Sequence, residues 1–445
     1  MNIDLFFSIS IFLIFVLWII YYLSNLNTSG LLWEKTLQIR KMTIDFVKTI
    51  NSFGEPSDWD KERIIPQKPG LLFTYYSIPL LITNNCDYER FNEPIYLFLN
   101  FDEECLNLTW NETIRIYDEN FKEVPFKFVK QEFCSEGYLK NSIVFFEVNI
   151  SSKSSKIYQV LFSNISSIKF KDYGNFSNLV LWLTFDEGSG TIAYDYSGNS
   201  NHGTIYNGTQ VCAGNLTHNT TCPQWVDGVF GKALSFDGVD DYLEVYNSPK
   251  LNPIDDGFTI SFWINLSSYV SPGAIITKRT DYLDGYFIFI WNNNNLYFDW
   301  GGSDNNRWNT NYSPQLNNWY FITFLQNSSG RFLYVNGNII SYTSNKGNTS
   351  LASSNSPLRI FSDTIDLRYF NSGIIDELRI YNRDLSEEEI ISYYTCGPLD
   401  LRIYPIKNLE LLSFEKMEVL RNFSYSVIKD IIQKGYNFRV EVYEK

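Results

Sequence analysis

The sequence predicts a mainly β protein, in which two β-sandwich domains follow an N-terminal transmembrane and stalk helix and precede a short α+β tail. One mostly apolar run near the N-terminus, without a charge, proline or glycine, predicts the helix. Short segments of β-branched and aromatic residues, separated by turn residues, fill residues 66–172 and 178–395 and predict the two sandwiches. With 445 residues, the chain is long enough to bury a core in each domain.

The composition narrows the range of functions before any motif is considered. Lys+Arg number 36 and Asp+Glu 50, which gives a formal net charge of −14. This balance argues against nucleic-acid binding, because that binding needs Lys and Arg to neutralise phosphates. The chain has 2 His and 6 Cys, and it lacks the glycine-rich phosphate-binding motifs. The chain therefore has few residues for His-based catalysis or for a metal site made of His and Cys.

Residues 1–54 predict a membrane anchor and a helical stalk. Residues 5–23 read LFFSISIFLIFVLWIIYYL, nineteen positions without a charge, proline or glycine. At about 1.5 Å per residue, this run approaches the ~30 Å thickness of the hydrocarbon core. A cleaved signal peptide and a buried core helix are the alternatives. Asp4 before the run and Tyr-Tyr-Leu at its end do not resemble signal-peptide flanks, so we expect an uncleaved anchor.

Two signals disagree on the orientation of this anchor. Lys35, Arg40, Lys41 and Lys48 follow the run and favour a cytoplasmic C-terminal side. Fourteen Asn-x-Ser/Thr sequons and an even number of cysteines favour an exported, oxidising environment instead. Large domains translocate largely regardless of nearby charge. We therefore expect a single-pass protein of the cell membrane with extracellular domains.

The stalk and the tail carry a first family resemblance. Apolar residues recur loosely at helical spacing over residues 31–50, before Gly54 and Pro56. NSFGEPSDWD at 51–60 and the tail FSYSVIKDIIQKGYNFRVEV resemble the corresponding parts of archaeal type IV pilin-like proteins. The resemblance implies a helix-then-strand tail over 396–445 and self-assembly into a filament through the N-terminal helix. The chain departs from the family in lacking a basic prepilin cleavage site, which puts the filament in doubt.

Residues 66–172 predict a small antiparallel sandwich with no convincing helix. The segments IPLLITNN, ETIRIYDENFKEVPFKF and VFFEVNISSKSSKIYQVLFSN resemble a β-sandwich family of unknown function from archaeal and bacterial surface proteins. That resemblance implies a structural or adhesive role and no catalytic residues. The clearest predicted strands are residues 78–83, 95–100, 114–117, 126–129, 143–150 and 157–162.

Residues 178–395 give a stronger β pattern. The apolar residues of FTISFWIN (258–265) alternate with other residues and predict one buried strand face. Asn-Gly at 336–337 predicts a type I′ hairpin turn. Ser386 and Glu389 predict a capping box that opens a short terminal helix.

This second region resembles the laminin-G-like, concanavalin A-like jelly rolls of lectins and glucanases. LVLWLTFDEGSG, DYSGNSNHGTI, GVFGKALSFDGVDDYLEV and GIIDELRIYNRDLSEEEI follow one another in the family's order. The resemblance implies a jelly roll with a lectin-like role, binding a glycan or a partner protein on another surface.

The resemblance also implies a Ca²⁺ site, because many such domains hold this ion. Asp186 in DEGSG and Asp376 in DELRIY lie in segments that run close together in the family, and Ca²⁺ takes six to eight oxygen ligands. The alternative is that both carboxylates accept hydrogen bonds from backbone N–H groups at turns. Asp237, Asp240 and Asp241 in FDGVDDY are interpreted as turn formers and solvated edge residues.

Glycoside hydrolysis is the enzymatic alternative, since the fold also hosts glucanases. That chemistry needs two carboxylates that face each other across a cleft. No Glu-x-Asp-x-x-x-Glu spacing occurs, and the neighbours Asp376 and Glu377 would point to opposite faces of a strand. We therefore expect no enzymatic activity. His202 is interpreted as a structural loop residue and His218 as a solvent-exposed one.

Exposed aromatic side chains are the predicted ligand-binding device, because sugars stack on aromatic faces. Trp308 and Tyr312, in the polar stretch that follows Trp300, are the residues that we expect to bind the ligand. Trp291 and Trp300 are interpreted as core residues in the alternative, in which Trp308 alone is exposed.

The cysteines predict disulfides. Cys212 and Cys222 bracket a polar loop, VCAGNLTHNTTC, that a local disulfide would close. The other four cysteines allow three pairings, of which we favour Cys105–Cys134 with Cys86–Cys396.

These observations predict a membrane-anchored surface protein that binds or adheres through its second β domain. The alternative is a structural, pilus-like or envelope component whose jelly roll binds no glycan.

Overall fold

The fold is described from a computed structural model. The described residues are 72–101, 111–120, 122–135, 137–162, 176, 178–212, 221–253, 257–301, 306–345, 353–403 and 407–412. The predicted anchor, stalk and helix of the tail lie outside these ranges. Among the described residues, no helix is long and apolar enough to cross a membrane.

The chain divides into two compact units, Met1–Ser77 with Lys407–Lys445 and Ile78–Ile406. Of the first unit, the structure describes an antiparallel pairing of residues 72–77 with β26 (Lys407–Leu412). The second unit contains both predicted β domains. We call residues 78–162 with β25 the first domain, and residues 178–396 the second domain.

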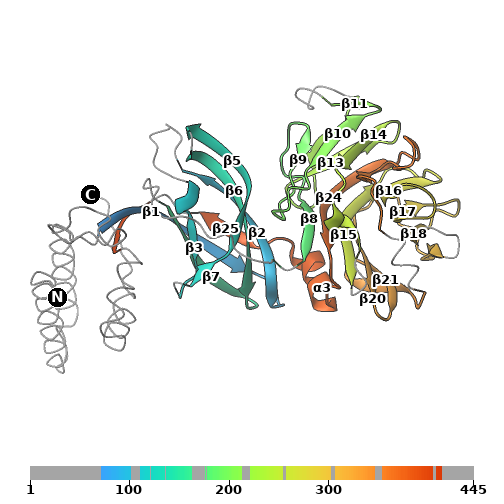
Figure 1. Ribbon diagram of the computed structural model, residues 1–445. Helices are drawn as coiled ribbons and strands as arrows, with labels where there is room; N and C mark the ends of the chain where they lie inside the picture. The colour runs from blue at the N-terminus through green and yellow to red at the C-terminus, as the bar shows by residue number, and fades with distance from the viewer. Residues whose placement is uncertain are drawn as a thin grey trace, which may run out of the picture. The chain divides into compact units, whose positions relative to one another are not determined.

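The first domain packs two antiparallel sheets face to face, as the sequence predicts (Figure 1). One sheet has the strand order β25-β1-β7-β3-β4, and the other the order β2-β6-β5. Leu97, Ile116 and Phe146 are fully buried between them. The bounds are β1 (Leu72–Asn84), β2 (Arg90–Asn100), β3 (Arg115–Tyr117), β4 (Glu123–Val124), β5 (Phe126–Ser135), β6 (Tyr138–Ile150), β7 (Ser154–Phe162) and β25 (Asp400–Ile403), with a 3₁₀ turn at Asn111–Thr113.

The strand β25 pairs with the first domain although it follows the second domain in the chain. The sequence assigns residues 396–445 to a separate tail, but residues 400–403 pair antiparallel with β1, from Leu80↔Ile403 to Thr83↔Asp400. This pairing satisfies backbone groups of β1 that an edge strand would leave open. The chain therefore returns to the first domain after completing the second.

The second domain consists of two stacked antiparallel sheets within the described residues. Eight strands in the order β12-β13-β24-β15-β20-β21-β22, with β8 beside β24, form the β24 sheet. Nine strands in the order β11-β10-β14-β23-β16-β17-β18-β19, with β9 beside β10, form the β17 sheet. The bounds are β8 (Leu179–Leu183), β9 (Ile192–Ala193), β10 (Gly203–Asn207), β11 (Gln210–Val211), β12 (Gln224–Asp227), β13 (Lys232–Asp237), β14 (Asp241–Val245), β15 (Phe258–Leu266), β16 (Gly273–Lys278), β17 (Tyr286–Ile290), β18 (Leu296–Trp300), β19 (Trp308–Asn309), β20 (Tyr320–Asn327), β21 (Gly330–Val335), β22 (Asn338–Thr343), β23 (Leu358–Ile360) and β24 (Ser372–Tyr381).

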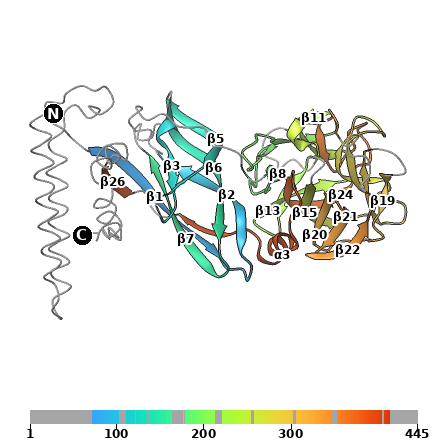
Figure 2. The same ribbon diagram turned by 60° about the horizontal axis from the view of Figure 1, so that its bottom comes forward.

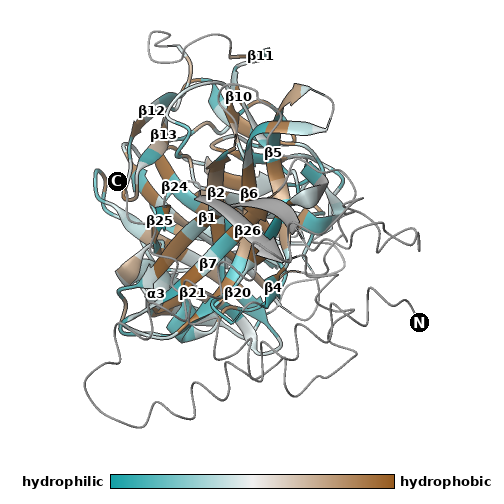
Figure 3. Cartoon of the chain, turned by 90° about the vertical axis from the view of Figure 1, so that its left-hand side faces the viewer, coloured by the Kyte–Doolittle hydropathy of each residue, from teal (hydrophilic) through white to brown (hydrophobic). Residues whose placement is uncertain are grey.

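Strand alternation produces the main core between these two sheets. Phe258, Ile260, Phe262 and Ile264 of β15 all point into this core, as the pattern predicts. Trp263, between them, points to the opposite face of the sheet. Figure 3 shows hydrophobic residues in brown along many of the strands, with hydrophilic residues in teal between them and in loops.

Two local signals in the sequence are confirmed by backbone geometry. Asn336 and Gly337 have φ values of 50° and 78°, as a type I′ turn between β21 and β22 requires. Helix α3 (Glu387–Cys396) begins with a complete capping box, in which Ser386 and Glu389 exchange side-chain and backbone hydrogen bonds.

The outer face of the β24 sheet is covered by α3 and by the first domain. A second hydrophobic cluster there joins Val129 and Phe145 of the first domain to Trp182, Phe321 and other residues of the second. Figures 1 and 2 place α3 beside β2 on this side of the second domain. The two domains therefore share one buried apolar cluster.

Buried polar groups also join the two domains at this contact, which we call the seam. Arg90, which is 2% exposed, donates from Nη2 to the carbonyl oxygens of Ser392 (3.1 Å) and Gly397 (2.7 Å). Its Nη1 lies 3.3 Å from Glu93 Oε1. The disulfide Cys86–Cys396 joins the start of the first domain to the end of α3, as the sequence predicts. The seam is therefore held by covalent, polar and apolar contacts together.

Replacing Arg90 with alanine is expected to destabilise the chain by about 3–5 kcal/mol, because Glu93 would remain buried without its charged partner. Urea denaturation followed by tryptophan fluorescence measures this change. The control is Arg402→Ala, since Arg402 is 68% exposed at its pair with Asp400 and should change stability by less than about 0.5 kcal/mol. Equal stability of the two variants would contradict the assignment.

Candidate functional site

The predicted Ca²⁺ ligands Asp186 and Asp376 lie on either side of one turn. Asp376 Oδ2 accepts hydrogen bonds from the backbone N–H groups of Val229 (2.8 Å) and Phe230 (3.0 Å). Asp186 Oδ1 accepts from Lys232 N (2.8 Å). These bonds match the alternative in which both carboxylates satisfy backbone amides at turns.

Glycines make this close approach possible. A Cβ atom on Gly231, which has φ +62°, would lie 2.0 Å from Asp186 Oδ1. A Cβ atom on Gly228 would lie 2.5 Å from Asp376 Oδ2. The two carboxylates can therefore bind the turn only because both positions lack a side chain.

One oxygen of this pair remains without a hydrogen-bond partner. Asp376 is fully buried, and its Oδ1 accepts no hydrogen bond from the described residues. Burial, together with the negative charge of Glu377, raises the pKa of Asp376 to about 8. The Tyr96 hydroxyl donates to Asp186 Oδ2 at 2.9 Å, so the first domain contributes directly to this group.

The predicted ligand-binding aromatics occupy different positions from those expected. The expectation that Trp308 is exposed is wrong: it is 7% exposed and belongs to the core between the sheets. Its strand β19 pairs with β18 at Phe298↔Trp308, which turns both rings inward. Tyr312 packs against the same core and meets the Tyr320 ring edge-on at 6.1 Å. Trp308 is therefore a core residue, whereas Tyr312 is half-buried and its predicted role in ligand binding stays a prediction.

The structure also locates several of the predicted cysteine and histidine residues. Cys212 and Cys222 form the predicted local disulfide. Cys134 is disulfide-bonded, whereas its predicted partner Cys105 lies outside the described residues. His202 accepts a hydrogen bond at Nδ1 from the backbone N–H of Asp195 (2.9 Å), which agrees with a structural loop role. His218 also lies outside the described residues.

A different aromatic group lies on the outer face of the β17 sheet. In β17, Tyr286, Ile288 and Ile290 point into the core, while Phe287 and Phe289 form a separate cluster on the opposite face. The rings of these two phenylalanines are stacked 4.2 Å apart. The half-buried rings packed on this cluster are Trp291, Tyr297 and Tyr369. We call these five aromatic residues the aromatic patch.

Arginine side chains surround the aromatic patch and its continuation across the sheet. Each guanidinium lies over a ring at a distance typical of cation–π contacts, which holds its plane against the sheet surface. The pairs, as centroid distances, are Arg279 over Phe287 at 3.9 Å, Arg307 over Trp291 at 4.1 Å, Arg359 over Tyr242 at 4.9 Å and Arg368 over Tyr369 at 4.5 Å.

Carboxylates pair with the same arginines. A surface that alternates aromatic rings with hydrogen-bonding charged groups can hold a ligand that has both apolar faces and polar edges. The ion pairs are Arg279–Asp363 (2.7 Å), Arg307–Asp299 (3.2 Å), Arg359–Glu244 (2.8 Å) and Arg368–Asp366 (3.4 Å).

Asp299 has a distinct environment on this face. It is 6% exposed, and its Oδ1 has no hydrogen-bond partner among the described residues, while Oδ2 lies 3.2 Å from Arg307 Nε. Burial raises the pKa of Asp299, and the positive charge of Arg307 opposes that rise. A buried carboxylate oxygen without a partner is suited to accept a hydrogen bond from a bound hydroxyl group.

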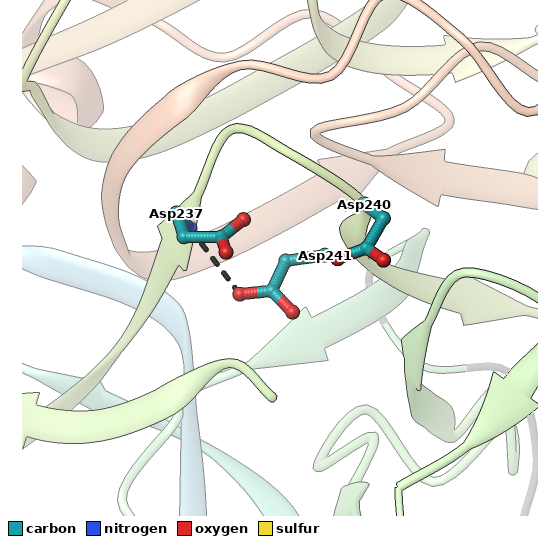
Figure 4. Close-up of side chains that lie close together, drawn as sticks. All are labelled: Asp237, Asp240 and Asp241. Atoms are coloured by element: carbon teal, nitrogen blue, oxygen red, sulfur yellow. Dashed lines mark hydrogen bonds between the residues drawn. The ribbon is translucent and has the colours of Figure 1, made fainter. Parts of the chain in front are cut away.

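An acidic cluster lies at the turn between β13 and β14 (Figure 4). Ligand oxygens of Asp237, Asp240 and Asp241 all lie within 4.8 Å of one another. Asp241 is 2% exposed and accepts from the backbone N–H of Asp237 at 3.2 Å. This bond agrees with the interpretation of the cluster as a turn, but the burial of Asp241 differs from the predicted solvated edge.

The sequence alone could not have revealed the aromatic patch. Every residue of YFIFI in β17 is apolar or aromatic and buried, so alternation does not distinguish the core face from the outer one. Arg307 and Asp363 lie outside the regular strands, and the fold alone brings them to this sheet. The sequence did offer one signal: Tyr297 and Asp299 of β18 are two positions apart, a spacing that places both on the same face of a strand.

Comparison with known proteins supports the fold of the second domain. Residues 237–391 match the family model Laminin_G_3, described as the concanavalin A-like lectin/glucanases superfamily. This domain is therefore concanavalin A-like, as its sequence predicts. The structure extends it upstream, because β8 to β13 belong to the same two sheets. No curated protein matches the sequence.

Solved structures with a similar fold include binding domains of larger proteins. Domain 4 of AbnA, a GH43 extracellular arabinanase from Geobacillus stearothermophilus, in complex with arabinotriose, is 19% identical (TM-score 0.39) and covers 49% of this chain and 98% of that one. The binding domain of Paraclostridial Mosquitocidal Protein 1 is 22% identical (TM-score 0.37), with 49% and 52% covered. The binding domain of botulinum neurotoxin DC, in complex with rat synaptotagmin II, is 20% identical (TM-score 0.37), with 49% and 51% covered.

The chain thus spans about half the length of these two toxin domains. At such identities and TM-scores, the ligands of these proteins carry no information on the ligand of this chain. The resemblances predicted for the anchor, the tail and the first domain remain predictions.

The acidic cluster is expected to make stability depend on pH. Burial, then the charges of Asp237 and Asp240, raises the pKa of Asp241 to about 7 in the folded chain, above its usual value near 4. Between about pH 4 and 7 the folded state therefore binds more protons than the unfolded state. The contribution of Asp241 to the free energy of unfolding is complete below about pH 4 and is lost as pH rises through about 7.

Between pH 5 and pH 8, the free energy of unfolding should change with pH by on the order of 1–2 kcal/mol less in Asp241→Asn than in the unchanged chain. Melting temperatures recorded across this pH range measure the difference. The exposed Asp281, changed to asparagine, is the matched control and should leave the slope unaltered. An unchanged slope in Asp241→Asn would show that another group titrates in this range.

Proposed function

We propose that the second domain binds glycans on the outer face of the β17 sheet. The observation that carries this proposal is the aromatic patch with its flanking arginines and the partnerless Oδ1 of Asp299. A sugar ring offers apolar C–H faces to aromatic rings and hydroxyl groups to charged side chains. Trp291 and Tyr297 would provide the stacking surface, and Asp299 with Arg307 the hydrogen bonds.

The two outer faces of the second domain differ in a way that supports this location. The face of the β24 sheet is covered by α3 and the first domain, and its aromatic rings belong to a buried cluster. Half-buried aromatic and arginine side chains remain on the β17 sheet. Sequon asparagines among the described residues of this domain are Asn207, Asn265, Asn311 and Asn327, none of which lies on β16, β17 or β18.

We propose that this binding is not catalytic. Glycoside hydrolysis needs one carboxyl group as a proton donor and a second across a cleft. Asp299, Glu244 and Asp363 on this face each form an ion pair with an arginine. Those pairs suit recognition, since they fix the side chains in one geometry.

The cellular setting is part of the same proposal. Residues 5–23 would anchor the protein in the cell membrane, with both β domains outside, where the two disulfides could form. Self-assembly through the N-terminal helix stays a prediction for residues outside the described ranges.

We also propose that Asp186 and Asp376 hold a Ca²⁺ ion. The partnerless, buried Oδ1 of Asp376 fits such a role, because a hard cation would satisfy this oxygen. The three other carboxylate oxygens already accept hydrogen bonds from Val229, Phe230, Lys232 or Tyr96. Backbone carbonyls would therefore have to supply much of the ligand shell.

Glycan binding is tested with the full chain in detergent on a glycan array, followed by titration of the best ligand. Trp291→Ala and Tyr297→Ala should each weaken binding roughly tenfold, or about 1.4 kcal/mol, because each removes a stacking surface. Tyr342→Ala is the control, since Tyr342 is 51% exposed but lies on β22 of the other sheet. Absence of binding to every glycan would sink the proposal.

The Ca²⁺ proposal is tested by thermal denaturation of the full chain. Millimolar Ca²⁺ should raise the melting temperature by roughly 5 °C over chelator, since the ion would bind the folded state alone. Asp376→Asn should abolish this rise, whereas Asp227→Asn, at an 89% exposed side chain, should retain it. Identical melting curves with Ca²⁺ and with chelator would rule the site out.

A further inference from the structure

Two arginines of the candidate face are each more exposed than a carboxylate beside them. The side chain of Arg307 is 26% exposed and that of its partner Asp299 is 9% exposed. Arg368 is 32% exposed, whereas Asp363, which it approaches, is fully buried. In these two pairs the positive member lies nearer to solvent than the negative one. The carboxylates Glu244 (17%) and Asp366 (62%) are more exposed than their partners Arg359 (15%) and Arg368 (32%).

Asp363 is shared between two arginines. Arg279 donates to it from Nε (3.0 Å) and Nη2 (2.7 Å), and Arg368 Nε lies 3.7 Å from the same carboxylate. One buried negative charge thus faces two guanidinium groups. Asp366, whose side chain is 62% exposed, is the further carboxylate beside Arg368.

Other carboxylates near this face are engaged in a turn. Asp284 accepts hydrogen bonds from the backbone and hydroxyl of Thr280, and Asp281 accepts one from the backbone N–H of Leu283. They lie in the loop between β16 and β17, at the rim of the patch. Arg279, Arg307 and Arg368 each lie over one face of a ring in the patch, namely Phe287, Trp291 and Tyr369.

We infer that this face selects anionic saccharides, meaning sugars that carry a carboxylate or a sulfate group; this rests on the proposed glycan binding. The sugar ring stacks on Trp291 and Tyr297, and its anionic group binds the exposed edges of Arg307 and Arg368. Guanidinium groups held flat against aromatic rings are preorganised for such anions.

The test compares charged and neutral oligosaccharides on the full chain in detergent. Oligogalacturonate supplies the carboxylate and a heparin oligosaccharide the sulfate. Neutral counterparts are the methyl-esterified galacturonate and de-sulfated, carboxyl-reduced heparin. We expect at least one charged ligand to bind tenfold more tightly than its neutral counterpart, and binding to weaken as salt increases.

Substitutions of arginine test whether the outer face of the β17 sheet causes the preference for charged ligands. Arg307→Gln and Arg368→Gln should each weaken charged-ligand binding five- to tenfold, while Arg307→Lys should retain part of it. Arg402→Gln, at an exposed side chain of β25, is the control and should bind within twofold of the unchanged chain. Melting temperatures of all variants confirm that they fold.

The outcomes separate this inference from the proposed function. Preference for charged ligands that both glutamine variants reduce supports the inference. Equal binding of neutral and charged ligands, lost in Trp291→Ala and unaffected by the arginine variants, overturns the anionic preference and leaves glycan binding in place. Failure of every glycan to bind overturns both.

Discussion

The buried guanidinium of Arg90 is the contact on which the arrangement of the two β domains depends. It binds two carbonyl oxygens at the end of α3 and lies beside Glu93, with almost no exposure to solvent. Such a group is stable only where every partner is in place. The apolar cluster and the disulfide Cys86–Cys396 join the same two domains.

This seam determines which surface of the second domain is available to a ligand. Once α3 and the first domain cover the outer face of the β24 sheet, its rings become core. The β17 sheet keeps half-buried rings and arginines on its outer face. The first domain thus packs on one sheet, and the opposite sheet is the one on which we propose that glycans bind.

Much of the fold was predictable because it depends on local patterns. The alternation in β15, the Asn336–Gly337 turn and the Ser386 capping box are decided by residues close in sequence. Site residues were harder to predict. The ring of Trp308 was expected in solvent, but pairing with β18 turns it into the core. The patch on β17 was missed, since five consecutive buried residues give no indication of which face is outermost.

The sequence by itself determined the β class, the concanavalin A-like jelly roll and the Cys212–Cys222 disulfide, because strand period, turn chemistry and motif order are properties of short segments. Only the tertiary structure decided that residues 400–403 return to the first domain, and which aromatics face outward. It also brought arginines from loops over rings on β17. Those outcomes depend on contacts between residues far apart in the chain, and no local pattern encodes them.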